Sequence, residues 1–561
     1  MGSAWEADAP GGDGRIPFTF RIGVTGHREF DNPDELRAAV RKALRGLIEL
    51  LPVASAAGLT PVVVSALAEG ADRLVAEEIL ADPEARLEVA LPLPPLDYEE
   101  DFKAEASKEE FRRLLARASI TWTAPTTEDP PTKQDRDKAY ELAGQYVVDR
   151  SDALIALWDG EDPRGPGGTA EIVAYAQDNG VPVAWINTKG SPEPTYAHSY
   201  NQDSRTKVLT QAAGKLRTYN ARVIDSEKFD RRIQDLRDEL MPDVAREIPI
   251  DPLGLSREKV ADWVFPHYVR ADILALHYQR WFLWLSQLIF GLAAGAVVVV
   301  ALQVTIWPQH DWVVDFEVFF LGLLLVILGM NRRLRLHDQW ISSRFLAERF
   351  RSSYFLALAG TGDQRETGDQ RGRSPRIAFF SDSSEAWIER ALSEAIACRP
   401  HLNAGSVPLD VLRDYLKRHW IEGQISYQTR RSGQLRATDR WLAWIVKGLF
   451  AVTFIAAVVH SIGSYIFTVP EDWKKALLII SITFPAIGAA LHGYVAQRQF
   501  RRNSERYRTM AGVLAQVRTD MSEATELKEV QEVARETERV MREENSDWFG
   551  VMRFHDIELI T

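Results

Sequence analysis

The chain has 561 residues, a formal net charge of −12 at pH 7 and one cysteine, Cys398. This length exceeds what a single hydrophobic core supports, so we expect two or three domains. The acidic balance, without a basic face beside exposed aromatic residues, argues against a nucleic-acid partner. A lone cysteine excludes an internal disulfide framework, and the scattered histidines show no metal-ligand spacing, so no metal site is expected.

The first third of the chain alternates short β-rich runs with amphipathic helical patterns. This alternation predicts an α/β, Rossmann-like domain over 17–187, with a parallel sheet covered by helices on both faces. Ligands of such sheets bind beyond the carboxyl ends of the strands. The expected strands are 18–24, 61–65, 87–91, 120–122, 153–158 and 181–186, and the expected helices are 33–50, 70–81, 107–117, 133–150 and 169–179.

The first expected strand runs into a glycine turn, residues 23–28, before a helical pattern begins. Such a turn gathers free backbone N–H groups at one point, which attracts phosphate. The arginine can donate a bidentate pair to phosphate, and the histidine can stack on or hydrogen-bond a base. Alternatively, both side chains cap the turn or face solvent. The expected ligand contacts are Gly23, Thr25, Gly26, His27 and Arg28.

A second small-residue turn follows the strand 61–65 and brings the backbone beside the first turn. Its aspartate falls in the first turn of the next helix, where the helix dipole favours a carboxylate. A ligand contact and a simple capping role are both open for this side chain. The expected ligand contacts here are Ser65, Ala68, Glu69, Gly70 and Asp72.

A third glycine-rich loop follows the strand 153–158 and leads into a helix. Its glycines and threonine would present backbone N–H groups at a helix N-terminus, a place that suits phosphate. The short segment 133–136 (Lys-Gln-Asp-Arg) either supplies a charge partner to that phosphate or begins an exposed helix. The expected ligand contacts are Asp159, Gly160, Gly167, Gly168, Thr169 and Glu171.

Three of these motifs resemble known families. Residues 64–77 resemble the Ser-Gly-Leu-Ala-x-Gly-Ile-Asp signature of the Smf/DNA-processing A family, with Ala66 in place of the first glycine. Residues 165–171 resemble the Pro-Gly-Gly-x-Gly-Thr-x-x-Glu motif of the lysine-decarboxylase-like LOG proteins. With the early Thr-Gly-His-Arg, they make the domain similar to the SLOG superfamily. The resemblance implies a nucleotide-derived ligand, such as a cyclic nucleotide or an ADP-ribose derivative, and no other cofactor.

One position departs from the enzymes of that superfamily. LOG phosphoribohydrolases use a glutamate three residues beyond the threonine, whereas Glu171 lies two beyond Thr169 and Ile172 holds the third position. A shift of one residue turns a side chain by about 100° around a helix. We therefore assign no catalytic residue, and the resemblance still implies phosphate binding by Gly167, Gly168 and Thr169.

Four long apolar blocks mark the rest of the chain. The first, 281–304, has no charged side chain over 24 residues, enough to cross a hydrocarbon core of about 30 Å. The others are 313–330, 448–469 and 476–496. These blocks predict an all-α membrane region with four transmembrane helices in two hairpins, whose partner is the lipid bilayer.

Arginines follow the second and fourth blocks, whereas the loop 305–312 has neither lysine nor arginine. The loop 470–475 balances its two lysines with acidic residues. Positive residues favour the cytoplasmic side, so both short loops should face outward. We expect a multi-pass protein of the cell membrane with cytoplasmic N- and C-termini. The arginines in question are Arg332, Arg333, Arg335, Arg498, Arg501 and Arg502.

The two hairpins resemble each other. Residues 280–284 (Arg-Trp-Phe-Leu-Trp) match 440–444 (Arg-Trp-Leu-Ala-Trp), and 348–352 (Glu-Arg-Phe-Arg-Ser) match 505–509 (Glu-Arg-Tyr-Arg-Thr). The order and the nearly constant offset favour duplication, although interfacial tryptophans and flanking arginines recur around any membrane span. The organisation resembles SLATT domains, which are two-helix membrane effectors found with SLOG sensors in bacterial conflict systems.

The expected function is a membrane effector, in a homo-oligomer, whose cytoplasmic domain senses a nucleotide-type small molecule and gates or perturbs the membrane. The alternatives are a membrane-anchored nucleotide N-glycosidase or phosphoribohydrolase, and a small transporter with a regulatory nucleotide domain. The expected organisation is a disordered leader (1–16), the SLOG-like domain (17–187), a helical connector (188–275), the first hairpin with a cytosolic helix (276–360), a cytosolic helical segment (361–435), and the second hairpin with a C-terminal helix (436–561).

Overall fold

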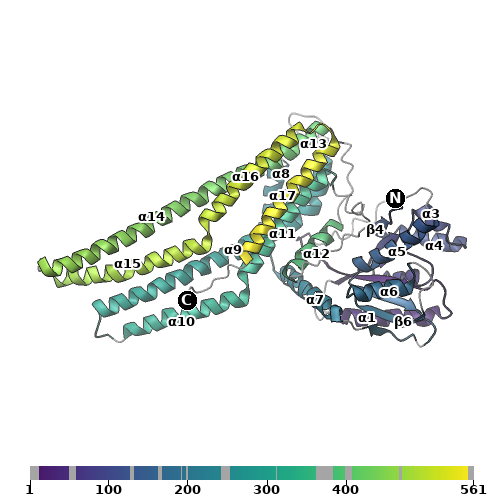
Figure 1. The fold of residues 1–561 in the computed structure, drawn as a ribbon, viewed down its shortest axis with the longest axis horizontal. Helices are drawn as coiled ribbons and strands as arrows, with labels where there is room; N and C mark the ends of the chain where they lie inside the picture. Colours follow the sequence, from purple (N-terminus) through teal and green to yellow (C-terminus); the bar gives the residue numbers. More distant parts are fainter. Residues whose placement is uncertain are drawn as a thin grey trace. The chain divides into compact units, whose positions relative to one another are not determined.

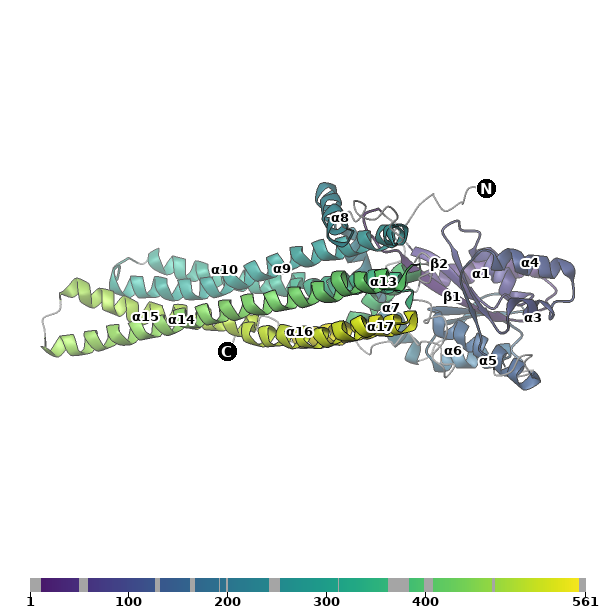
Figure 2. The ribbon, with the colours of Figure 1, turned by 90° about the horizontal axis from the view of Figure 1, so that it is seen from above.

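The computed structural model forms two compact units, which we call the sheet unit (Met1–Asp230 with Gly362–His401) and the membrane unit (Arg231–Thr361 with Leu402–Thr561). Figures 1 and 2 show their elements from two directions. The structure describes residues 12–49, 59–126, 132–161, 167–190, 192–197, 200–241, 253–310, 312–361, 383–397, 407–466 and 470–553.

A seven-stranded sheet forms the centre of the sheet unit. Its strands are β1 (Phe18–Gly26), β2 (Leu59–Ser65), β3 (Arg86–Leu91), β4 (Ala118–Thr123), β5 (Ala153–Trp158), β6 (Val183–Asn187) and β7 (Thr195–Ala197). The strand order is β4-β3-β2-β1-β5-β6-β7, and only β7 pairs antiparallel. The predicted mostly parallel sheet is therefore confirmed, and β1 lies at its centre.

Helices cover both faces of this sheet because its central strands are apolar on both sides. On one face α1 packs on α2, and on the other α5 packs on α6, as Figure 2 shows. The short α3 and the three-residue β7 had escaped prediction, since neither is long enough to show a periodic pattern. The helices of this part of the chain are α1 (Pro33–Glu49), α2 (Ala71–Ile79), α3 (Pro95–Glu99), α4 (Glu105–Leu115), α5 (Lys133–Arg150), α6 (Thr169–Asp178), α7 (Tyr200–Ala221) and α8 (Ser226–Leu240).

One helix joins the sheet unit from far along the chain. The helix α12 (Ser383–Ala397) packs on α7 and β1, although it lies between the two hairpins in sequence. Sequence patterns had placed it in the cytosolic segment 361–435. Most of the expected leader, 1–16, lies outside the described residues, but Ile16 is fully buried and its N–H donates to Asn220 Oδ1 at 3.1 Å.

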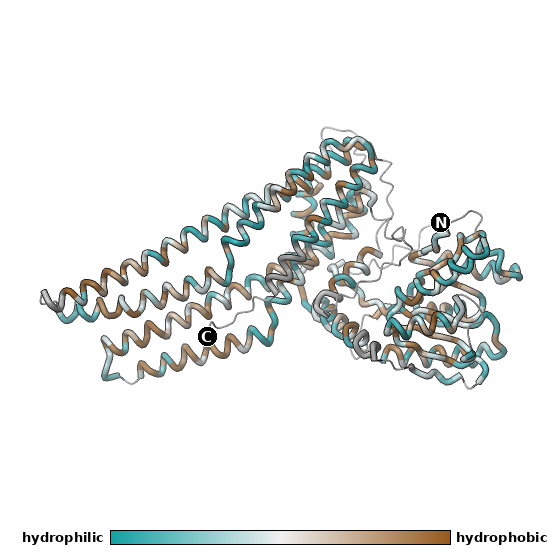
Figure 3. Tube along the Cα trace, in the orientation of Figure 1, coloured by the Kyte–Doolittle hydropathy of each residue, from teal (hydrophilic) through white to brown (hydrophobic). Residues whose placement is uncertain are grey.

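The membrane unit contains four helices long and apolar enough to cross a membrane, among the residues that the structure describes. Figure 3 shows hydrophobic residues along these helices. Many large apolar side chains point outward from them, such as Phe454, which is 70% exposed. Such a surface is unfavourable in water, so it requires lipid or another protein surface around it. The helices are α9 (Gly254–Thr305), α10 (Trp312–Leu334), α14 (Gly423–Ile466) and α15 (Glu471–Arg498).

The second helix of each hairpin ends at a residue in the left-handed conformation, Arg335 or Gln499, both at φ 46°. Neither is a glycine, so each break costs about 1 kcal/mol or more. The helices α11 (Leu336–Leu358) and α16 (Phe500–Glu523) then begin. The break at Arg335 separates the second membrane helix of the first hairpin from the cytosolic helix that was expected after it.

The two hairpins share one packing scheme. The long helix α9 packs on α10 and then on α11, and α14 packs on α15 and then on α16. The repeated Glu-Arg-aromatic-Arg motif begins at residue 348 in the first hairpin and at 505 in the second. It therefore starts 13 residues after the helix break at 335 and 6 residues after the break at 499. The difference of seven residues is two helical turns, so the motif keeps its face of the helix. This shared organisation supports duplication.

The C-terminal tail forms two helices, α16 and α17 (Leu527–Arg553), rather than the single helix expected. Between these helices, the backbone N–H of Thr525 donates to the Glu529 carboxylate at 2.7 Å. This hydrogen bond stabilises the start of α17. The helix α17 packs on both α11 and α16, and its Glu538 and Glu544 form ion pairs with the two motif arginines, Arg349 and Arg506. Two further elements, α13 (Leu409–Tyr415) and a π-helix (Leu416–Glu422), precede α14.

Candidate functional site

Three loops meet at the carboxyl ends of the central strands. Because β1 pairs with both β2 and β5, the loops that follow these strands leave the sheet side by side. The backbone N–H of His27 donates to Leu157 O at 3.0 Å, and the N–H of Ala71 donates to His27 O at 3.0 Å. The loop after β1 therefore contacts the end of β5 and the start of α2 directly.

His27 connects the first loop to the third. The Asp159 N–H donates to His27 Nε2 at 3.2 Å, and Asp159 Oδ1 lies 2.9 Å from the same nitrogen. Lys189 Nζ lies 3.0 Å from the other carboxylate oxygen. Although desolvation opposes it, hydrogen bonding to His27 and Lys189 lowers the pKa of Asp159 well below its usual range. His27 thus holds the loop after β5, and it would have to leave Asp159 to stack on a base.

Asp72 organises the second loop. Its Oδ2 accepts the Ser65 hydroxyl at 3.0 Å and the Ala66 N–H at 3.1 Å. The turn also holds buried Leu67 at φ 56°, a left-handed conformation that is costly for a branched side chain. Burial raises the pKa of Asp72 to about 6, against the hydrogen bonds from Ser65 and the backbone. Asp72 therefore holds the loop that precedes α2, and its buried carboxyl group can change charge near neutral pH.

Gly70 allows the first and second loops to touch. It has φ 80°, and a Cβ at this position would lie 2.3 Å from Arg28 O. Gly26 is equally confined, since a Cβ there would lie 2.5 Å from Ala71 Cβ and 2.6 Å from Leu157 O. Only glycine fits at such approaches of backbone to backbone.

The third loop already holds a carboxylate at the N-terminus of α6. Glu171 Oε2 accepts the N–H of Gly167 at 2.8 Å, so the glutamate closes its own loop. Gly168 is the N-cap residue and Thr169 the first helical residue. A phosphate bound to these N–H groups would take the place of the Glu171 carboxylate. Residues 162–166 of this loop lie outside the described part of the chain.

Not every predicted contact lies at this edge. Gly23 lies inside β1, where a Cβ would meet Ser151 Oγ at 2.4 Å, so it provides room for the end of α5. The Glu69 carboxylate accepts the Ser107 hydroxyl of α4. Gly160, at φ 84°, turns the chain after β5 beside Trp185. Thr25 is the last residue but one of β1, and Ala68 lies within the second loop.

Arg28 is exposed at this edge, and no acidic side chain of the described residues forms an ion pair with it. Its charge nevertheless acts on Asp72 and on two tyrosines, Tyr98 and Tyr140. Tyr98 is fully buried, and its hydroxyl has no hydrogen-bond partner among the described residues. The edge therefore combines an exposed cation without an ion pair among the described residues with two buried groups beneath it, the Tyr98 phenol and the Asp72 carboxyl group.

Tyr98 and Tyr140 were missing from the sequence-based site. Tyr98 lies on α3, which follows β3, and its ring packs edge-on against Phe102 at 5.0 Å and Phe111 at 5.6 Å. Tyr98 lies just beyond the end of β3, as the predicted contacts lie beyond the ends of β1, β2 and β5, and this position is the signal that could have identified it. Arg136 pairs with Asp101 at 2.8 Å, and Tyr140 donates to the same carboxylate. Arg136 is therefore occupied by an acidic residue of its own chain.

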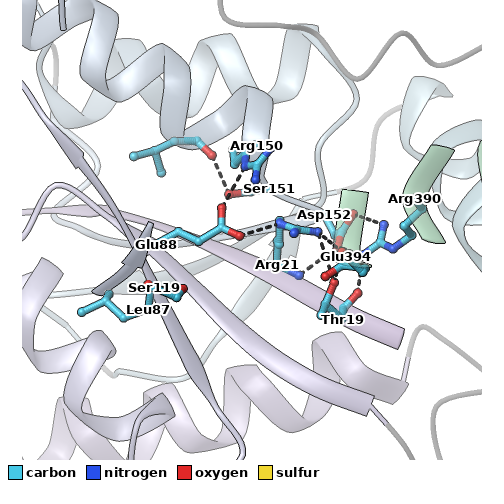
Figure 4. Close-up of polar contacts among 11 residues, drawn as sticks. Thr19, Arg21, Leu87, Glu88, Ser119, Arg150, Ser151, Asp152, Arg390 and Glu394 are labelled. Atoms are coloured by element: carbon cyan, nitrogen blue, oxygen red, sulfur yellow. Dashed lines mark hydrogen bonds and ion pairs between the residues drawn. The ribbon is translucent and has the colours of Figure 1, made fainter. Parts of the chain in front are cut away.

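The opposite, amino end of the sheet holds a buried network of charges, shown in Figure 4. Arg21 of β1 pairs with Glu88 of β3 at 3.1 Å and with Glu394 of α12. Arg150 pairs with the second oxygen of Glu88 at 2.8 Å. Desolvation opposes ionisation of Glu88, but Arg21 and Arg150 hold its pKa below the usual value.

The same network fastens α12 to the sheet a second time. Arg390 donates to Asp152 Oδ1 at 2.8 Å, and Asp152 Oδ2 accepts the backbone N–H of Arg21 at 2.8 Å. Three arginines and three carboxylates thus balance each other, and each has an oppositely charged partner. The pattern of Arg390 and Glu394, four residues apart on a helix, gave no sign of this role.

The fold and these sites define a membrane protein that combines an α/β parallel-sheet domain with four membrane-crossing helices. Residues 415–548 match the family model of the SMODS and SLOG-associating 2TM effector domain 1 (SLATT_1). The matched segment runs from the last residue of α13 into α17, so the second hairpin is similar to these two-helix effectors. The first hairpin lies outside the match. No curated protein and no solved structure matches the chain.

Proposed function

We propose that this protein is a membrane effector of bacterial defence, whose sheet unit is a SLOG domain that senses a nucleotide-derived signal. The ligand is a cyclic nucleotide or an ADP-ribose derivative, and the response is the opening of a pore or a perturbation of the membrane by a homo-oligomer. The N- and C-termini are cytoplasmic and the helices cross the cell membrane. The observation that carries the proposal is the meeting of the loops at His27, next to Arg28, which forms no ion pair with the described residues, in one chain with a segment similar to effector domains.

The groups at this edge suit a phosphorylated ligand. Arg28 supplies a guanidinium group that can bind phosphate through two parallel hydrogen bonds. Displacement of Glu171 would free the N–H groups at the start of α6 for a second phosphate oxygen. Asp72 and the Tyr98 hydroxyl can then hydrogen-bond the hydroxyl or amino groups of a nucleoside.

The chain order supplies a route from ligand to membrane. The helix α12 is held against β1 by the charge network, and in sequence it lies between α11 of the first hairpin and α13 before the second. A change in the sheet unit therefore acts on segments that lead to both hairpins. The ligand shifts this equilibrium only if it binds the active arrangement more tightly than the resting one.

The test uses the full chain in liposomes that contain a self-quenching dye. We expect one of ADP-ribose, cyclic ADP-ribose, cyclic AMP or cyclic GMP to release the dye, and mass spectrometry to find the same compound bound to the protein purified from cells. The variant Arg28→Gln should lose at least tenfold in sensitivity to it. Arg45→Gln, which removes an equally exposed charge on α1, should respond normally.

Other outcomes would contradict the proposal in distinct ways. Release of a free base from the nucleotide would indicate the membrane-anchored hydrolase instead. Uptake of the compound into the liposomes without dye release would indicate a transporter. Equal responses of Arg28→Gln and Arg45→Gln would show that the edge around Arg28 is not the ligand site.

A further inference from the structure

The inner end of α15 carries two polar residues directly after its apolar stretch. Gln497 and Arg498 follow the apolar residues 476–496, and the helix then breaks at Gln499 with φ 46°. With about 20 residues needed to cross the hydrocarbon, these two side chains lie at the level of the lipid headgroups. On the neighbouring α14, the exposed Trp441 and Trp444 mark the same level, since exposed tryptophans concentrate at membrane interfaces.

The polar atoms here are buried without partners. Neither amide atom of Gln497 has a hydrogen-bond partner among the described residues, and the same holds for Arg498 Nε. The charged or titratable groups that act on Arg498 are Arg431, Tyr494 and Tyr507, none of which is an acid. Leaving a buried amide or guanidinium group unsatisfied costs several kcal/mol in order of magnitude. The Arg498 guanidinium group lies over the Phe500 ring, 5.4 Å from its centroid, and has no anionic partner among the described residues.

Two arginines close to Arg498 do have acidic partners. Arg501, three residues later, is exposed and pairs with Glu505 at 3.2 Å, and Arg506 pairs with Glu544 on α17. In the first hairpin, the residue before the break is Leu334 in the position of Arg498. The unmet charge is thus particular to the second hairpin and to the end of α15.

We propose that Arg498 and Gln497 bind the phosphate of an anionic phospholipid at the inner end of α15. The guanidinium group can bind two phosphate oxygens and the amide can donate to a third. Arg431 adds a second positive charge nearby, which favours an anionic headgroup over one that carries an amine. Exposed apolar side chains along α14, such as Phe454 and Ile455, provide a surface for the acyl chains.

The test counts bound lipid on the full chain. The protein is reconstituted in nanodiscs of phosphatidylcholine mixed with phosphatidylglycerol, released gently, and weighed by native mass spectrometry. We expect Arg498→Gln to lose one retained phosphatidylglycerol per chain. Arg501→Gln, with the same change of charge, should keep it, and Arg498→Lys should retain an intermediate amount.

Further measurements separate lipid binding from folding and from free anions. Circular dichroism should show equal helix content in the variants, and if Arg498→Gln does not fold, Gln497→Leu should still lower the retained lipid. Equal retention by Arg498→Gln and Arg501→Gln would overturn the proposal. So would a rise in melting temperature with inorganic phosphate as large as that with short-chain phosphatidylglycerol, because the site would then take a free anion. A loss of oligomers in Arg498→Gln without loss of lipid would point to a carboxylate of a second copy.

Discussion

The two ends of the central sheet differ in how completely their charged groups are paired with opposite charges. At the amino end, Arg21 is buried between Glu88 and Glu394, and every charge of the network has an opposite partner. At the carboxyl end, Arg28 forms no ion pair with the described residues and the Tyr98 hydroxyl has no partner among them. The first end is completed by a helix of the same chain, whereas the second leaves groups available to a ligand.

One strand, β1, contributes residues to both ends. Arg21 and the glycine turn at Gly26 lie only five positions apart on β1. Buried ion pairs are costly to break, so the amino end should resist change, while the strained loops at the carboxyl end can rearrange. The predictions below test this difference by hydrogen–deuterium exchange of β1, β2 and β3 in the full chain.

The largest effect should follow from breaking the amino-end network. Arg21→Met removes the shared partner of Glu88 and Glu394, so Glu394 is buried without a cation and Glu88 keeps only Arg150. We expect the free energy of opening that hydrogen–deuterium exchange reports for β1 to fall by about 3–5 kcal/mol. The control Arg41→Met removes an exposed partner of Glu78 and should cost less than about 1 kcal/mol. Equal losses in the two variants would mean that burial adds nothing to the network.

A smaller loss should follow from Gly70→Ala at the carboxyl end. The new Cβ would lie 2.3 Å from Arg28 O, on a residue with φ 80°. The strain of such a conformation is about 1–3 kcal/mol, and the loops must also separate. Exchange of the loop after β2 should therefore increase. Gly214→Ala on α7, where a Cβ meets nothing within 4 Å, should stabilise or leave the protein unchanged. Unchanged exchange in Gly70→Ala would contradict the close approach of the loops.

The pH dependence of Asp72 should have the opposite sign to that of the paired carboxylates. Its pKa is raised to about 6 in the folded chain, above the unfolded value of about 3.9. The stability that it contributes is therefore fully present below pH 4 and is lost as the pH rises through 6. The free energy of unfolding of the wild type should fall by on the order of 2 kcal/mol between pH 4 and 8, and Asp72→Asn should not show this fall. Parallel pH profiles of the wild type and Asp72→Asn would refute the raised pKa.

The smallest effect on stability should come from Arg28→Gln. The side chain is exposed and forms no ion pair within the described chain, so protection should change by less than about 0.5 kcal/mol. The same variant should lose its response to the ligand, as stated above. A loss of several kcal/mol would show that Arg28 holds the fold together and that the two ends are alike after all.

Local patterns predicted much of this architecture because strands, helices and spans depend on residues close in sequence. The alternation of apolar runs and amphipathic helices predicted six strands of the sheet, and the charge-free block 281–304 predicted the first membrane helix. Glycine turns such as Gly26 and Gly70 pointed to the edge where the loops meet, since parallel strands end together there.

The sequence by itself thus determined the parallel sheet, the four membrane-crossing helices and the edge of the sheet that carries the candidate site. Only the tertiary structure showed that α12 completes the sheet unit, because Arg390 meets Asp152 across 238 residues and helix periodicity cannot reveal such a partner. It likewise decided that Glu171 closes its own loop, that the Tyr98 hydroxyl has no hydrogen-bond partner among the described residues, and that α15 breaks at Gln499. In each of these cases the outcome depends on which groups meet in space and which remain unsatisfied, and no local pattern records that.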